Sequence, residues 1–168
     1  MHDQIFESTV VSTAIKSECG RYRYVLKRIW NSNGEIGAFL CANPSKADQL
    51  LLDDTVFKCG NLAVYWGWGG FYILNLYPIY STDPKGVERN TETDEHNAYH
   101  IAAVVASVKI LVLACGNGHR RRLDELIQDI PREKLFCLRR NSGGGFLHPS
   151  RIKPEDFTRP VRAFEQLA

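Results

Sequence analysis

Four short apolar runs, separated by segments of helical periodicity, constrain the fold of this chain more than any other feature. The runs are residues 36–41, 71–76, 109–114 and 134–138. Each has the length and nearly continuous apolar character of a strand buried on both faces. The alternation of strand and helix predicts an α/β domain with a four-stranded parallel sheet covered on both sides, a three-layer α/β/α fold.

Three helices and one further strand are expected around these runs. The helices are predicted at residues 53–66, at about 94–108, and after Gly118 as far as Pro131, which ends the last one. Residues 22–30 alternate well enough to form a strand that turns at 31–34. The polar segment 81–93 is expected to be a long loop.

Length and composition predict a single domain over residues 1–168. The chain has 44% hydrophobic and 24% charged residues, as globular domains do, and it contains no linker, repeat or low-complexity tract. A formal net charge of +2 neither establishes nor excludes a nucleic-acid partner, because clustering of charge matters more than its total.

The sequence predicts a cytoplasmic protein without a membrane partner. Residues 1–10 lack the apolar core of a signal peptide, and the longest apolar runs have only the length of strands. The five cysteines are widely spaced and form no CxxC pair, which favours reduced thiols in the core. They are Cys19, Cys41, Cys59, Cys115 and Cys137.

Polar residues follow the carboxyl end of each predicted parallel strand. In open parallel sheets, ligands bind outside these ends. Asn43, Asn75 and His148 are therefore expected to converge at one site. Each also has a structural interpretation: Asn43 as a turn residue, Asn75 as a buried amide bonded only to backbone, and His148 as an ordinary loop histidine.

Several familiar sites are not predicted. No GxGxxG motif follows the first strand, and neither a GxxxxGK[ST] phosphate loop nor a GxSxG nucleophile elbow occurs. Asp48, Asp53 and Asp54 lie close together, but helix capping explains them better than a metal does. We therefore expect no metal and no cofactor.

Seven motifs in combination resemble a family of small bacterial and phage proteins known only as a domain of unknown function. The resemblance extends from about Cys19 to His148. The motifs are residues 19–30, Asn43-Pro-Ser-Lys-Ala-Asp48, Asp53-Asp-Thr55, Trp66-Gly-Trp-Gly-Gly70, Asn75-Leu76, Thr82-Asp-Pro84 and His148-Pro-Ser150. That family in turn resembles a divergent branch of the uracil-DNA glycosylase superfamily.

The second resemblance implies a role for each candidate residue. Asn43 would position water and His148 would stabilise the transition state. Asn75 would read a flipped base, next to Pro44 and Ser45. Around the His148 loop, the residues expected to contact DNA are Arg139, Arg140, Ser150, Arg151, Lys153 and Ile152, the last at the position of the wedge that replaces the flipped base.

The chain departs from the superfamily pattern at two positions, and the second of them shapes the expected substrate. Cys41 stands where a glycine is usual, and the small Ser45 replaces a bulky tyrosine that rejects 5-substituted bases. The resemblance therefore implies a monomeric DNA glycosylase acting on a modified pyrimidine, in a setting of phage-DNA modification or antiphage defence. Two alternatives remain open: a nucleic-acid or nucleotide binding module that has lost the chemistry, and an N-glycosidase acting on free nucleosides.

Overall fold

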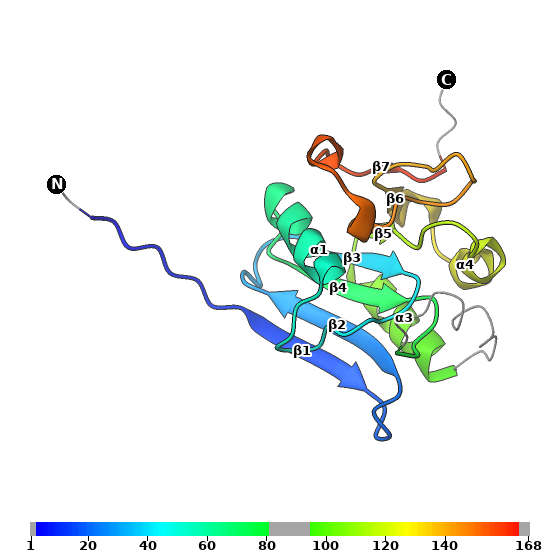
Figure 1. The fold of residues 1–168 in the computed structure, drawn as a ribbon, viewed down its shortest axis with the longest axis horizontal. Coiled ribbons are helices and arrows are strands. Elements are labelled where there is room, and N and C mark those ends of the chain that lie inside the picture. Colours follow the sequence, from blue (N-terminus) through cyan, green and yellow to red (C-terminus); the bar gives the residue numbers. More distant parts are fainter. Residues whose placement is uncertain (1–2, 81–94, 165–168) are drawn as a thin grey trace.

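A seven-stranded mixed sheet forms the centre of the computed structural model, which describes residues 3–80 and 95–164 (Figure 1). The strand order is β1-β2-β4-β3-β5-β6-β7. The strands are β1 (Val11–Lys16), β2 (Arg23–Ile29), β3 (Ile36–Cys41), β4 (Gly70–Asn75), β5 (Leu111–Leu113), β6 (Leu135–Cys137) and β7 (Val161–Arg162).

The sheet is larger than the four-stranded sheet expected from the sequence. Strands β4, β3, β5 and β6 pair in parallel, and these are the four apolar runs. Antiparallel β1 and β2 extend one edge, and antiparallel β7 extends the other. The additions place β2 directly beside β4, so its first residue can reach the carboxyl end of β4.

Helices cover both faces of the sheet, which gives three layers. Helix α1 (Asp54–Tyr65) packs on one face through Val56, Cys59 and Leu62. Helices α3 (Glu95–Ser107) and α4 (Arg120–Ile127) contribute to a separate apolar cluster on the opposite face. The three predicted helices are confirmed, with bounds within a few residues of those expected. Within the described ranges, no helix is long and apolar enough to cross a bilayer.

Both ends of α1 are fixed by local signals in the sequence. The Asp53 carboxylate accepts a hydrogen bond from the Val56 amide at 2.8 Å, which confirms Asp53 as a helix cap. At the other end, Gly67 has φ +77°, and the amides of Gly67 and Trp68 bond back to Val64 and Ala63. This left-handed glycine termination explains the first glycine of the Trp66–Gly70 motif.

Three 3₁₀ turns complete the described elements: η1 (Arg132–Lys134), η2 (Pro149–Arg151) and η3 (Pro154–Asp156). Turn η2 follows His148 and lies near the start of α1, where Lys58 donates a hydrogen bond to the Ser150 carbonyl at 2.8 Å. The predicted loop 81–93 and the Thr82-Asp-Pro84 motif lie outside the described residues.

Candidate functional site

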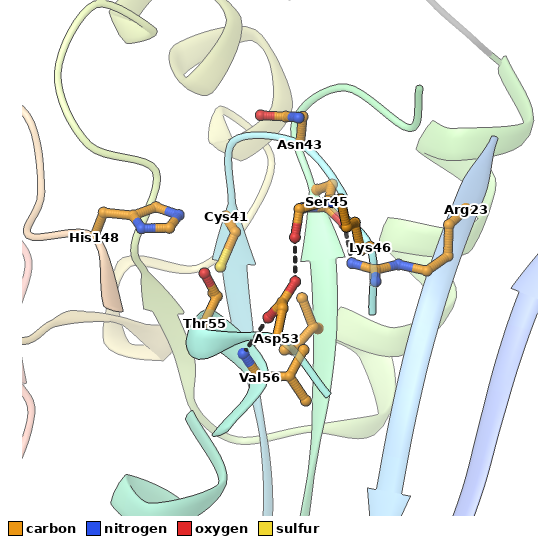
Figure 2. Close-up of a pocket in the computed structure, with 11 residues that line it drawn as sticks. Arg23, Cys41, Asn43, Ser45, Lys46, Asp53, Thr55, Val56 and His148 are labelled. Atoms are coloured by element: carbon orange, nitrogen blue, oxygen red, sulfur yellow. Dashed lines mark hydrogen bonds between the residues drawn. The ribbon is translucent and has the colours of Figure 1, made fainter. Parts of the chain in front are cut away.

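A pocket of about 330 Å³ lies at the carboxyl ends of β3 and β4 (Figure 2). The strand-end residues Asn43, Asn75 and His148 all line it, together with Ser45. Its other lining residues are Arg23, Cys41, Lys46, Asp53, Thr55, Val56 and Ile73. The structure thus brings two loops, the ends of β3 and β4, the start of α1 and the first residue of β2 together around one cavity.

His148 is held by the turn that follows it. Its Nδ1 accepts a hydrogen bond from the Ser150 amide at 3.2 Å and lies 2.8 Å from the Ser150 hydroxyl. A backbone amide can only donate, so Nδ1 of the neutral ring carries no proton and Nε2–H is the remaining donor of the ring. Figure 2 shows the ring directed into the pocket beside Cys41. Ser150 therefore orients His148.

Asn75 is almost completely buried at the end of β4, with 1% exposure. Its Oδ1 accepts a hydrogen bond from Nη2 of Arg23 at 3.1 Å. Its Nδ2 has no hydrogen-bond partner among the described residues. The strand end itself is fixed from α3, because the buried Asn97 donates to the carbonyl oxygens of Asn75 at 3.0 Å and Leu76 at 3.4 Å.

Arg23 is a pocket residue that sequence reasoning did not single out. It starts β2, is 2% exposed, and donates to the Ala47 carbonyl at 2.6 Å as well as to Asn75. Burial lowers the pKa of its guanidinium, and Tyr80 and Asp53 act in the opposite direction. Arg23 is one of several basic residues between Arg21 and Arg28, so nothing in the sequence distinguished it, and its place in the pocket depends on the pairing of β2 with β4.

Ser45 and Asn43 form the opposite wall and rim of the pocket. The Ser45 hydroxyl donates to the Asp53 carboxylate, so one carboxylate both caps α1 and fixes the loop after β3. Asn43 lies at the rim, where its Nδ2 donates to the Pro44 carbonyl at 3.1 Å. Pro44 is buried and is not among the lining residues, so a direct contact of Pro44 with a ligand is not supported.

Two buried thiols adjoin His148. Hydrogen bonds from the Cys59 thiol and from His148 lower the pKa of Cys41 to about 6, although burial acts in the opposite direction. Burial and the same hydrogen bond raise the pKa of Cys59 well above its usual range. All five cysteines are free, and four are buried as expected, whereas Cys19 is exposed.

A second, wider cavity of about 730 Å³ adjoins the pocket and shares Asn43 and His148 with it. Three of the predicted DNA contacts, Arg139, Arg140 and Arg151, line it, and so does Ser150. No carboxylate is present in this lining, as far as the chain is described. We call this cavity the basic groove.

The arginine side chains of the basic groove differ in how many hydrogen bonds and ion pairs hold them. Arg140 donates through Nε and Nη2 to the Ala163 carbonyl at 2.9 and 2.6 Å, which ties it to the C-terminal segment. Nη2 of Arg139 lies 3.6 Å from Oδ1 of Asp156, but the Arg139 side chain is largely exposed. Arg151 is exposed, and its guanidinium makes no hydrogen bond or ion pair with the described part of the chain.

Two predicted DNA contacts lie elsewhere. Ile152 is 7% exposed and packs in the apolar cluster beneath α1, so the proposed wedge is instead a core residue. An apolar side chain after a surface turn gains more from joining this cluster than from remaining in water. Lys153 is exposed and pairs with Glu155 at 3.8 Å, and neither residue lines the pocket or the basic groove.

The acidic residues near the pocket have structural partners. Asp48 accepts the amides of Leu50 and Leu51 at 2.9 and 2.8 Å, and Asp54 pairs with Lys58 at 3.0 Å. In the described ranges, no group of three or more histidine, cysteine or acidic residues has the arrangement of a metal site.

Comparison with known proteins identifies one related family. No curated protein and no solved structure matches the chain. A family model described as "Protein of unknown function (DUF1643)" matches residues 23–150, which include every residue that lines the pocket and, with one exception, the basic groove. The exception is Arg151. The chain therefore belongs to the DUF1643 family of proteins of unknown function.

Proposed function

We propose that this protein is a DNA glycosylase that hydrolyses the N-glycosidic bond of a modified pyrimidine and leaves an abasic site. The observation that carries the proposal is the common pocket of Asn43, Asn75 and His148 at the strand carboxyl ends. These are the residues to which the resemblance to uracil-DNA glycosylases assigns water positioning, base reading and transition-state stabilisation.

The chemistry needs a donor at the departing base and a water at the sugar. Water adds to the anomeric carbon and releases a proton to the solvent, while the bond to the base breaks and its electron pair passes to the base. Nε2–H of His148 would stabilise the developing negative charge on a base oxygen. The Asn43 amide, at the rim, would orient the water, although an amide is a poor general base.

The basic groove supports a nucleic-acid substrate over a free nucleoside. Arg139 and Arg151 are exposed there, next to the residues shared with the pocket. Phosphate contacts of this kind supply the salt-dependent part of DNA affinity. A nucleotide flipped from the strand would place its base in the pocket and its flanking phosphates in the groove.

The size and lining of the pocket support a substituted base. Its volume of about 330 Å³ lies at the lower end of the range of small-molecule sites, roughly 300–1,000 Å³. Ser45 and Thr55, both small, form part of the wall. A ring substituent would meet hydroxyl groups there and not an aromatic barrier.

Abasic-site formation tests the proposal. The protein is incubated with unmodified, uracil-containing and hypermodified phage DNA, and the products are treated with alkali to cleave abasic sites. We expect cleavage of one modified DNA, lost in Asn43→Ala while DNA binding is retained. Absence of abasic sites on all three substrates would contradict the proposal.

A binding module of the same fold is the second candidate, and one observation favours it. Asp53 is the one carboxylate in the described pocket lining, and its oxygens already accept from the Val56 amide and the Ser45 hydroxyl. No carboxylate is therefore free to act as a base. Tight, salt-dependent DNA binding without base release would select this candidate. Release of base from free nucleosides, undiminished in Arg151→Ala, would select a small-molecule N-glycosidase.

A further inference from the structure

The inner wall of the pocket contains a buried positive charge without a carboxylate partner. Arg23 is 2% exposed, yet no ion pair joins it to any described residue. Its guanidinium has two hydrogen bonds to neutral acceptors and lies 5.9 Å from the centre of the Tyr80 ring. Asp53 and Cys41 influence the pKa of the Arg23 guanidinium only as nearby charges. Its Nε–H is buried and unpaired within the described structure.

This arginine also fixes the orientation of the Asn75 amide. A guanidinium only donates hydrogen bonds, so the amide must turn its oxygen toward Arg23 and its nitrogen away. The Nδ2 group is the one left unpaired. Asn75 in isolation offers a ligand both a donor and an acceptor, but beside Arg23 it offers chiefly donors.

Unpaired buried donors are costly, and a ligand that accepts from them removes the cost. We infer that the wall formed by Arg23 and Asn75 is a subsite for a ligand group that presents hydrogen-bond acceptors and no donor. Among pyrimidines, this description fits the O2 and N3 atoms of a cytosine-type edge. It disfavours uracil and thymine, whose N3–H would face the Asn75 N–H group. A carboxylate has the same acceptor-only chemistry.

The inference rests on the pocket that the proposed function also uses, but it requires no turnover. It adds a residue, Arg23, and a preference of one base edge over another. Because the acceptor edge lies on the pairing side of the ring, it leaves the 5-position free for the substituents considered above.

Binding of free nucleosides tests the inference. Isothermal titration calorimetry of the full-length protein with deoxycytidine, deoxyuridine and acetate separates the two base edges and the carboxylate. We expect deoxycytidine to bind more tightly than deoxyuridine by on the order of tenfold. If acetate is the one probe that binds, the acceptor-only character of the subsite is supported and its ligand is a carboxylate. Equal or tighter binding of deoxyuridine, or no binding of any probe, would overturn the inference.

Asn75→Asp is the matched variant, because it keeps the shape of the side chain and replaces the two N–H donors with an acceptor. It also gives Arg23 a carboxylate partner, so we expect the variant to fold and to melt at a higher temperature than the parent in the absence of ligand. Its preference should move toward deoxyuridine. An unchanged preference in a folded variant would also overturn the inference.

The two proposals can fail separately. A protein that binds deoxycytidine selectively but forms no abasic site in any DNA would contradict only the glycosylase activity. An active glycosylase that prefers deoxyuridine would contradict only the acceptor-edge subsite.

Discussion

At the scale of single residues, His148 and Ser150 work as a pair. Turn η2 supplies both the backbone amide and the hydroxyl that hold Nδ1 of His148, which leaves Nε2–H directed toward the pocket. The ring orientation is therefore fixed before any ligand binds, as electrostatic stabilisation of a transition state requires.

Replacing His148 should slow catalysis and leave the fold intact. His148→Ala removes the proposed donor to the departing base, so we expect a barrier increase of about 2.7–4 kcal/mol, by analogy with the loss of one oxyanion donor. Ser150→Ala is the control for positioning: it keeps the backbone amide on Nδ1 and should cost less. Single-turnover rates with circular dichroism of each variant measure both effects. Full activity in folded His148→Ala would remove this residue from the mechanism.

The Cys41 thiol should ionise in the neutral range. Its pKa of about 6 predicts one thiolate absorbance step near that pH, best measured in a Cys19→Ser background because the exposed Cys19 has a pKa of about 7. Cys41→Ser should abolish the step, and Cys59→Ala should move it upward by removing a donor. A titration midpoint for Cys41 near the ordinary thiol value would contradict the described hydrogen bonds.

The same thiol affects stability with a defined sign. The folded pKa of Cys41 lies below the ordinary value of 9.0, so its ionisation favours the folded state above that value. This contribution is lost as the pH falls through about 6. The raised pKa of Cys59 acts in the opposite direction at alkaline pH.

The residues that could be predicted from the sequence are those governed by the strand-end rule. Asn43, Asn75 and His148 each follow a parallel strand, and the rule places such ends together. Arg23 could not be found in this way, because its position depends on antiparallel pairing of β2 with β4. Ile152 was misplaced because its burial depends on the path of the chain after His148.

At the scale of elements, α1 connects the fold to the site. Asp53 caps the helix and accepts from Ser45, while Lys58 reaches the Ser150 carbonyl. The start of this helix thus contacts two of the loops that line the pocket. The helices could be predicted from the sequence because capping residues and apolar periodicity are local signals. Strand β1 could not be predicted, because it is an edge strand with mostly exposed residues and no continuous apolar run.

Removing the cap should destabilise the protein measurably. Asp53→Ala is expected to lower the free energy of unfolding by about 1 kcal/mol, the usual value for a lost N-cap. Asp53→Asn retains a capping oxygen and should lose less. Asp54→Ala removes only an exposed ion pair with Lys58 and serves as the control. Urea unfolding measures all three, and equal stability of Asp53→Ala and the parent would contradict the capping role.

At the scale of the whole molecule, the fold places a basic groove beside the pocket although the net charge is only +2. Clustering on one face achieves this: the lining of the groove contains three arginines, and no carboxylate appears among its described residues. The total charge therefore gave no indication of the groove, which exists only once β5, β6 and the His148 loop are folded together.

DNA affinity should depend on Arg151 in a manner independent of sequence. Arg151→Ala should weaken binding to all DNA sequences about equally and reduce the slope of log affinity against log salt by roughly one unit. Arg121→Ala is the control, since Arg121 is 95% exposed on α4 and does not line the groove. Fluorescence anisotropy over a salt series measures both. An equal slope change in the two variants would show that the groove is not the DNA surface.

We propose that Asn43, Asn75 and His148 form a site that breaks an N-glycosidic bond in DNA. The most direct test is the count of alkali-labile sites in hypermodified phage DNA after incubation with the parent protein, Asn43→Ala and His148→Ala. We expect abasic sites with the parent, none above background with Asn43→Ala, and far fewer with His148→Ala. Abasic sites formed equally by all three folded proteins would contradict it.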